Sequence, residues 1–294
     1  MTPLDYDYLR RLLKQRSGLV LGAEKQYLVE SRLLPVARKA GLGSLAALVG
    51  ALKGADESAL TNAVVEAMAT NESFFFRDKV PFEHFRTIVM PALLKARPNS
   101  RYIRIWCAAA STGQEPYSLA MMLKEMDRKL ADWRIDILAT DISNEVLEKA
   151  RQGLYSQFEV QRGLPIQLLI KYFTQVGELW QIAPDIRAMV KFRQFNLLSD
   201  FSLLGMFDLI FCRNVLIYFD RPTKIDVLDR LAQLTFRDGY LVLGAAETVV
   251  GVTDSFHVVG DKHGLYAPND HWPKPPHQAG ARPVPRLVAL NGGR

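Results

Sequence analysis

The chain has 294 residues, of which 49% are hydrophobic and 23% charged. This composition is typical of a globular protein with a buried core and excludes wholesale disorder. The net charge of +6 permits nucleic acid, an anionic membrane or an acidic protein as a partner, without choosing among them. No apolar run approaches the roughly 20 residues that span a bilayer, and the N-terminus lacks an apolar signal segment. We therefore expect a cytoplasmic protein with no segment inserted in a membrane.

Residues 1–70 predict a helical domain, because their apolar positions recur at helical spacing and no strand pattern interrupts them. One helix is expected from Glu24 to Ala40, with a kink at Pro35. The residues expected to cap the other helices are Asp5, Ser44 and Asp56.

From Arg101 onward the pattern changes to short, nearly continuous apolar runs, which are typical of parallel strands buried on both faces. Helical segments separate these runs, so the sequence predicts a doubly wound α/β sheet. The expected strands are 101–110, 134–140, 207–214 and 240–246, followed by an antiparallel hairpin of 257–259 and 264–267, and the expected helices are 115–130, 143–152 and 221–237.

Three segments stand apart from this alternation. Residues 71–100 are expected to form a linker and the first helix of the sheet domain, which itself covers 101–267. Between residues 172 and 195, two short β-like runs around Pro184 predict a small antiparallel subdomain inserted in the sheet domain. Residues 268–294 are rich in proline and predict a flexible tail.

Ligands of open α/β sheets bind at the carboxyl ends of the strands. The first strand is followed by small residues up to Gly113, which let the main chain approach a ligand but are equally explained by tight packing of strand and helix. Asp141 follows the second strand and is placed to accept hydrogen bonds from ribose hydroxyls, with a helix cap as the alternative. Arg213 and Asn214 follow a later strand. The loop lacks the glycines of a pyrophosphate site, which favours an adenosine-type cofactor without phosphates, such as S-adenosylmethionine.

Cysteine and histidine chemistry contributes little to the predicted site. Cys107 and Cys212 lie in apolar runs and are expected to be buried packing thiols. The five histidines form no spacing that is typical of a metal site. We therefore predict no bound metal.

Five segments together resemble the chemotaxis receptor glutamate methyltransferases, the CheR family. They are A-T-N-E-S-F-F-F-R (69–77), S-T-G-Q-E-P-Y-S (111–118), A-T-D-I-S (139–143), F-x-x-x-N-L-L (192–198) and F-D-L-I-F-C-R-N-V-L-I-Y-F (207–219). The resemblance covers residues 6–266 and implies a helical N-terminal domain on a Rossmann-like S-adenosylmethionine methyltransferase domain with a small inserted β-subdomain.

The resemblance also implies the site residues. The family usually has Cys where this chain has Ala110 and Glu where it has Gln114, and neither departure removes a main contact. The implied cofactor-binding residues are Asn71, Ser73, Arg77, Glu115, Asp141, Asn196, Leu197, Arg213 and Asn214.

The implied substrate is a glutamate side chain, whose pKa near 4.3 leaves it ionised at pH 7, so that no catalytic base is needed. An Arg and a Tyr hydroxyl are suitable for orienting a carboxylate. Arg77 and Tyr218 are the expected catalytic pair, and core packing is the alternative for Tyr218, which lies in an apolar run.

Lys25, Arg32 and Lys39 are spaced by seven residues and share one face of a predicted helix. An ordinary solvated face explains such a stripe, but the family uses basic residues of this helix against the helical cytoplasmic domain of chemoreceptors. We therefore expect substrate docking here and a monomeric enzyme.

Two other functions are compatible with the residues. Nucleic-acid methylation suits the basic charge, but the Asp/Asn-Pro-Pro-aromatic motif of base aminomethylation is replaced here by Arg213-Asn214-Val215-Leu216. A non-catalytic cofactor-binding scaffold in a signalling array is the main alternative, and the presence of both Arg77 and Tyr218 argues against it. The short turn between Phe173 and Trp180 predicts that the enzyme works without a peptide tether at the receptor C-terminus.

Overall fold

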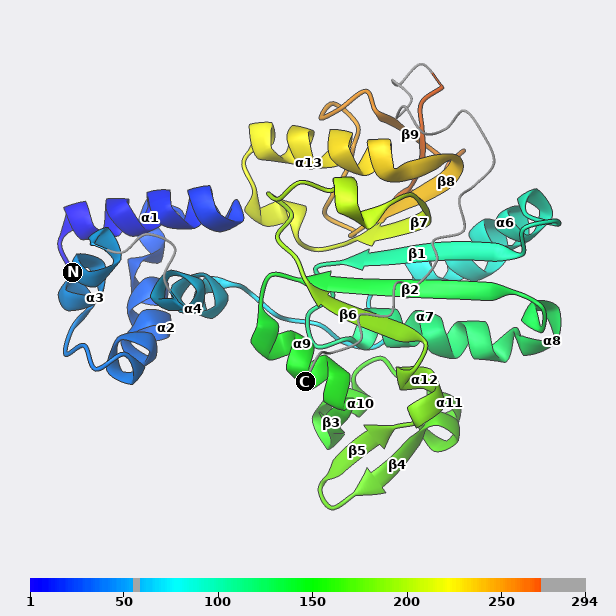
Figure 1. Ribbon diagram of the computed structural model, residues 1–294, viewed down its shortest axis with the longest axis horizontal. Coiled ribbons are helices and arrows are strands. Elements are labelled where there is room, and N and C mark those ends of the chain that lie inside the picture. The colour runs from blue at the N-terminus through cyan, green and yellow to red at the C-terminus, as the bar shows by residue number, and fades with distance from the viewer. Residues whose placement is uncertain (55–58, 271–294) are drawn as a thin grey trace, which may run out of the picture.

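The computed structural model describes residues 1–54 and 59–270, which form a helical domain beside a sheet domain (Figure 1). The helical domain has its own core, centred on Leu9, Leu13, Val29 and Leu33. Its elements are α1 (Pro3–Ser17), the 3₁₀ turn η1 (Ala23–Lys25), α2 (Gln26–Lys39), α3 (Leu45–Lys53) and α4 (Ala59–Met68).

The predicted helix caps are right in one case and wrong in another. Ser44 caps α3, because its side chain accepts the Ala47 N–H group. Thr2, not Asp5, caps α1; the Thr2 hydroxyl accepts the Asp5 N–H group and the Asp5 carboxylate accepts the Thr2 N–H group, so Asp5 is the third residue of a capping box. Asp56 lies outside the described residues.

The main sheet is mostly parallel, with strand order β6-β2-β1-β7-β8-β10-β9. The predicted strands and the closing antiparallel hairpin are confirmed, except that β8 begins at Thr235 and shortens the preceding helix. The strands are β1 (Tyr102–Ala108), β2 (Arg134–Asp141), β6 (Val190–Gln194), β7 (Phe207–Cys212), β8 (Thr235–Leu243), β9 (Phe256–Val258) and β10 (Leu265–Pro268).

Helices cover both faces of this sheet, with α13 on one face and α7 and α9 on the other (Figure 1). The covering elements are α5 (Val80–His84), the π-helical turn η2 (Phe85–Val89), α6 (Met90–Ala96), α7 (Gln114–Glu125), α8 (Asp127–Leu130), α9 (Asn144–Gln152) and α13 (Arg221–Leu234). Alternate strand residues supply the two cores: Ile105 and Cys107 pack on the α7 side, whereas Trp106 and Ala108 pack on the α13 side. Cys107 and Cys212 are buried and free, as predicted.

The small antiparallel sheet has the order β3-β5-β4 and lies at the bottom of Figure 1. The prediction that 190–195 belongs to it is wrong: β6 pairs in parallel with β2, so these residues form an edge of the main sheet. The third strand of the small sheet comes instead from residues 154–156. The elements of this region are β3 (Leu154–Ser156), α10 (Gln157–Gln161), α11 (Ile166–Tyr172), β4 (Phe173–Val176), β5 (Leu179–Ile182) and α12 (Pro184–Arg187).

Two short 3₁₀ turns, η3 (Ser202–Leu204) and η4 (Leu216–Tyr218), flank β7. The predicted tail falls outside the described residues from position 271 onward. Among the described helices, none is both long and apolar enough to cross a membrane.

Candidate active site

A pocket lies at the carboxyl ends of β1, β2 and β7, and the neighbours β1 and β7 mark the switch point of the sheet. It contains about 1030 Å³ of space, part of it open to solvent. All ten residues predicted for cofactor binding and catalysis line it: Asn71, Ser73, Arg77, Glu115, Asp141, Asn196, Leu197, Arg213, Asn214 and Tyr218. The structure brings these residues together, and the contact of each with a ligand stays a prediction.

The loop after β1 adopts left-handed backbone at three residues, with φ of 57° at Ala109, 51° at Ser111 and 92° at Gly113. A Cβ atom at Gly113 would lie 2.9 Å from the Cβ of Ala150, so only glycine fits this turn. The Ser111 hydroxyl donates to the Asn71 carbonyl at 2.8 Å. This bond joins the loop to the segment between the two domains.

Asp141 is buried at the end of β2 and lines the pocket. Its two carboxylate oxygens accept the N–H groups of Ser111, at 2.8 Å, and Ser143, at 3.0 Å. Ser143, not Asp141, caps α9, which removes the helix-cap alternative. Burial raises the pKa of Asp141, and these N–H groups oppose the rise. Because a carboxylate has about four acceptor positions, both oxygens keep capacity for a ribose hydroxyl.

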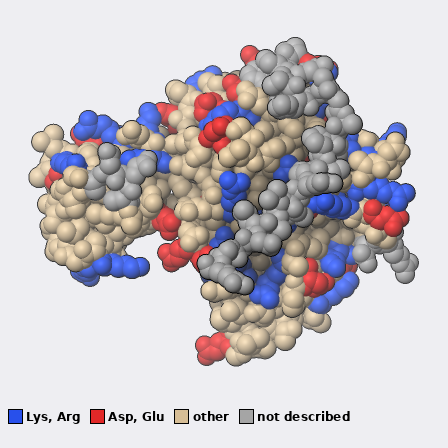
Figure 2. All heavy atoms as spheres, viewed as in Figure 1, with Lys and Arg blue, Asp and Glu red and all other residues tan. Residues whose placement is uncertain are grey.

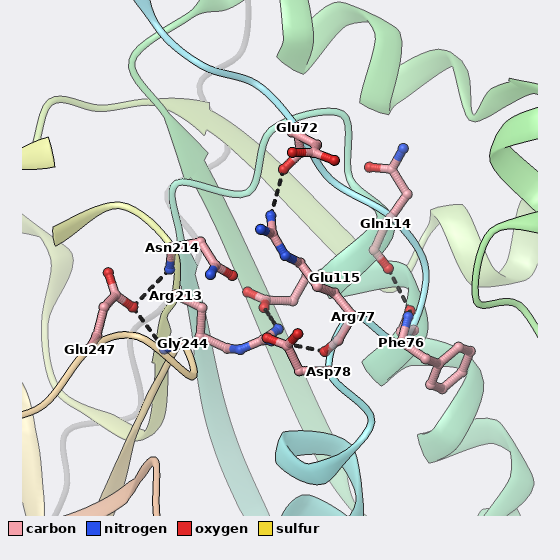
Figure 3. A network of polar contacts seen from close by, with 11 residues as sticks. Glu72, Phe76, Arg77, Asp78, Gln114, Glu115, Arg213, Asn214, Gly244 and Glu247 are labelled. Atoms are coloured by element: carbon pink, nitrogen blue, oxygen red, sulfur yellow. Dashed lines mark hydrogen bonds and ion pairs between the residues drawn. The ribbon is translucent and has the colours of Figure 1, made fainter. Parts of the chain in front are cut away.

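Arg213 connects three segments beneath the pocket (Figure 3). Its guanidinium donates to the Glu115 carboxylate at 2.6 Å, and to the Asp78 carboxylate and the Arg77 carbonyl, each at 2.8 Å. The Arg213 side chain is only 2% exposed. Burial raises the pKa of the Glu115 carboxyl, and the Arg213 charge opposes that rise. Arg213 therefore holds Glu115 in place and favours its ionised form.

Arg77 lies in a strained segment, since Phe76, Asp78 and Lys79 all have positive φ. Its guanidinium donates to the Glu72 carbonyl at 2.8 Å (Figure 3) and lies 5.5 Å from the ring centre of Phe74. The same segment is anchored in the sheet domain by Phe75, which is fully buried. Bound at both ends, the segment presents the Arg77 side chain to the pocket.

Tyr218 is half-buried at the end of η4 and packs against the sheet core while it lines the pocket. Its carbonyl accepts the Val20 N–H group at 2.9 Å. Tyr218 therefore both packs against the core and lines the pocket, so core packing alone does not describe its position. Arg77 and Tyr218, from different segments, face one pocket.

The asparagines of the site are fixed by the protein itself. The Asn196 side chain donates to the Arg16 carbonyl at 2.6 Å and accepts the Leu198 N–H group at 2.9 Å. Asn214 has a φ of 58°, a left-handed conformation that asparagine tolerates better than most residues. The two bonds orient the Asn196 amide at the pocket wall, and the backbone conformation of Asn214 sets the direction of its side chain.

Sequence reasoning missed three residues. Ser17 and Leu19, at the end of α1, line the pocket, so the helical domain contributes to it directly. Glu247 is buried after β8 and accepts several main-chain N–H groups of the neighbouring loop. It stands just beyond an apolar strand, the position that singled out Asp141, and the same criterion would have found it.

The predicted docking stripe is divided by the structure. Lys25 and Lys39 are exposed, whereas Arg32 donates to the carbonyls of Met68 and Ala69 at 2.8 and 3.0 Å. Arg32 thus binds the C-terminal end of α4, where a cation meets unpaired carbonyl groups. The Arg32 guanidinium thus binds within the helical domain. The docking prediction is therefore kept only for Lys25 and Lys39. Figure 2 shows Lys and Arg atoms at the lower edge of this domain.

The side chains that line the pocket fit an adenosine-type cofactor that carries positive charge. Two carboxylates line the pocket and would repel phosphates: Asp141, which is buried, and Glu115, whose side chain is 12% exposed. Apolar side chains, including Leu19, Leu197 and Val215, provide surface for a flat ring. S-adenosylmethionine has an adenosine, a sulfonium and an ammonium group, and these match the pocket without a phosphate-binding loop.

Comparisons with known proteins point to the same class of cofactor. A family model described as "CheR methyltransferase, SAM binding domain" matches residues 71–265, and one described as "CheR methyltransferase, all-alpha domain" matches residues 4–69. The chemotaxis protein methyltransferase Cher2 of Pseudomonas putida is 40% identical over 266 residues, covering 89% of this chain and 96% of that protein. Chemotaxis protein methyltransferase 1 of Pseudomonas aeruginosa is 41% identical, covering 89% and 96%. The chemotaxis protein methyltransferase of Salmonella typhimurium is 36% identical, covering 85% of each.

Proposed function

The chain belongs to the CheR methyltransferase family, and we propose that it methylates glutamate side chains of chemoreceptors, using S-adenosylmethionine and forming γ-glutamyl methyl esters in sensory adaptation. The observation that carries the proposal is that Arg77 and Tyr218 line the same pocket as Glu115 and Asp141. Groups suited to a substrate carboxylate thus lie beside groups suited to a cationic cofactor.

When bound, the cofactor supplies a methyl group on a positively charged sulfur. The substrate glutamate is ionised at pH 7 and is itself the nucleophile, so the protein has no proton to remove. Arg77 pairs with the substrate carboxylate and the Tyr218 hydroxyl donates to it, which orients one oxygen for attack. Enclosure by the helical domain removes water from the carboxylate and increases its reactivity.

The position of the cofactor follows from the acids. Asp141 accepts ribose hydroxyls with the lone pairs left by Ser111 and Ser143. Glu115, held by Arg213, balances the positive charge of the cofactor. Asn71, Ser73, Asn196, Leu197 and Asn214 complete the walls.

The partner in this proposal is the helical cytoplasmic domain of a chemoreceptor, and the enzyme acts as a cytoplasmic monomer. Lys25, the last residue of η1, and Lys39, the last residue of α2, are exposed cations on the domain that also lines the pocket. Acidic receptor helices that bind there would bring a glutamate toward Arg77 and Tyr218.

Transfer of a labelled methyl group to purified receptor cytoplasmic fragments tests the proposal. We expect incorporation that is released as methanol by mild alkali, as for an ester, and that is lost when receptor glutamates are changed to glutamine. Alkali-stable label would indicate another acceptor atom. Cofactor binding without transfer would favour the non-catalytic scaffold.

A further inference from the structure

Glu247 is a buried carboxylate that collects main-chain hydrogen bonds. It is 9% exposed. Its Oε1 atom accepts the N–H groups of Val215, at 3.0 Å, and Leu216, at 2.8 Å. Its Oε2 atom accepts those of Asn214, at 2.8 Å, and Gly244, at 2.7 Å, and Figure 3 shows these two bonds. Four donors thus converge on one side chain, which is well above the number that a helix cap or a turn requires.

Three of these donors belong to successive residues of the loop between β7 and α13. Within that loop, Asn214 has a left-handed conformation, with a φ of 58°, and Tyr218 is the last residue of the turn η4. Without an acceptor, three adjacent N–H groups in this partly buried loop would be unpaired, and the loop would shift to reach water. Glu247 therefore holds the loop in its present path.

The fit around Glu247 is close. A Cβ atom added to Gly244 would lie 2.8 Å from the Asn214 amide nitrogen and 2.8 Å from a Glu247 oxygen. A side chain at position 244 would separate the carboxylate from the loop. The end of β8 is therefore shaped to let Glu247 reach across to the end of β7.

The loop carries two groups of the proposed site, Asn214 for the cofactor and Tyr218 for the substrate carboxylate. Its far end is held by the bond from the Val20 N–H group to the Tyr218 carbonyl. Glu247 holds the near end. The two attachments fix both groups relative to the pocket.

We propose that Glu247 is a positioning residue of the methyl transfer: by binding the N–H groups of residues 214–216, it sets Asn214 for the cofactor and Tyr218 for the substrate. The role toward Tyr218 rests on the proposed function. The role toward Asn214 does not, because it is measured by cofactor binding alone.

The test uses Glu247→Gln and Glu247→Asp in the full chain. Glutamine keeps the shape but places an NH₂ group against two N–H donors, whereas aspartate keeps the charge on a shorter side chain. For Glu247→Gln we expect kcat to fall about tenfold or more, with the Michaelis constant for receptor within about twofold. Glu247→Asp should recover part of the loss.

Double-mutant cycles separate positioning from general stability. In a Tyr218→Phe background, Glu247→Gln should lower kcat by less than about threefold, because the group through which it acts is already removed. In an Asn214→Ala background, its effect on the dissociation constant for S-adenosylhomocysteine should likewise shrink. Asp208→Asn is the matched control: this carboxylate is fully buried and binds Arg97 and the Arg104 N–H group at the opposite end of β7. It should lower the unfolding temperature and leave kcat of the folded enzyme unchanged.

If Glu247→Gln has the same effect in the variant backgrounds as in the wild type, in both cycles, the proposal is overturned. Failure of both Glu247 variants to fold would also overturn it, because the carboxylate would then act in domain stability. A wild-type enzyme that methylates no receptor glutamate would overturn the proposed function instead. The cycle on cofactor binding would still decide the role of Glu247 toward Asn214.

Discussion

At the residue scale, each acid of the site has a partner within the protein before any ligand arrives. Asp141 accepts two main-chain N–H groups, Glu115 pairs with Arg213, and Glu247 accepts four N–H groups. Burial would otherwise favour protonation of such carboxylates. These partners oppose the rise in pKa at Glu115 and Asp141 and hold all three side chains in place, which reduces the reorganisation needed when a cation binds.

The pH dependence of cofactor binding follows from this arrangement. Burial raises the pKa values of Glu115 and Asp141, so both acids take up protons at a higher pH than ordinary carboxyls. If the ionised forms bind the cofactor, calorimetry with S-adenosylhomocysteine should show affinity falling as the pH is lowered, beginning above the ordinary carboxyl pKa of about 4.3.

Arg213→Met removes the charge that opposes the rise at Glu115, so the fall in affinity should begin at a higher pH in that variant. The same change in a Glu115→Gln background should produce no such displacement. An unchanged pH profile in Arg213→Met would contradict the proposed pairing.

Tyr218→Phe separates binding from chemistry. The variant should fold and bind S-adenosylhomocysteine as the wild type does, whereas kcat should fall roughly tenfold to a hundredfold, the equivalent of one hydrogen bond to a charged group. Tyr240→Phe, on the α7 side of the sheet, is the control and should be silent. Wild-type turnover in Tyr218→Phe would show that the hydroxyl takes no part.

At the element scale, the central strands and the site behind them could be predicted because buried parallel strands are nearly continuous apolar runs with polar residues at their ends. The edge strands β3 and β6 could not, since their alternating polar residues reflect one exposed face and do not reveal the sheet to which they belong. The hydrogen bonds of Arg32 could not be predicted either, because they depend on how α2 packs against the end of α4.

Arg32 links element stability to the pocket. It binds the carbonyls at the end of α4, directly before residues 70–77, several of which line the pocket. Arg32→Met leaves those carbonyls without this cation, and we expect a loss of about 1–2 kcal/mol in the free energy of unfolding, together with weaker cofactor binding. Thermal unfolding and calorimetry measure the two effects.

Arg38→Met is the matched control, because Arg38 is an exposed residue of the same helix. It should change neither quantity. If Arg32→Met reduced receptor binding while stability and cofactor affinity stayed at wild-type values, Arg32 would belong to the docking surface after all.

At the scale of the whole molecule, the helical domain makes direct contacts with the loop between β7 and α13. Lys14 pairs with Asp220 at 2.6 Å, and a Cβ atom at Gly18 would lie 2.9 Å from the Phe219 ring. Together with the bond between Val20 and Tyr218, these contacts place the end of α1 against the loop that carries Tyr218. A receptor that docks on the helical domain, as proposed, would therefore bind a body that shares the candidate active site.

Docking through the helical domain predicts a charge effect separable from chemistry. Lys25→Glu/Lys39→Glu reverses two exposed cations at the two ends of α2, one just before it and one at its last residue. This should raise the Michaelis constant for receptor fragments, since acidic helices would then be repelled. The dissociation constant for S-adenosylhomocysteine should stay unchanged. Wild-type activity at low receptor concentration should weaken with added salt, because exposed charges are screened over about 10 Å at 0.1 M ionic strength.

The control reverses two exposed lysines on the sheet domain, Lys95 of α6 and Lys129 of α8, which lie far from α2 (Figure 1). It changes the net charge by the same amount, so a general effect of charge would appear in both double variants. We expect the Michaelis constant to rise only in Lys25→Glu/Lys39→Glu. The activity of that variant should also be less sensitive to salt than the activity of the wild type. Equal responses in the two variants, or activity independent of salt, would return Lys25 and Lys39 to an ordinary solvated face and require the receptor to dock elsewhere.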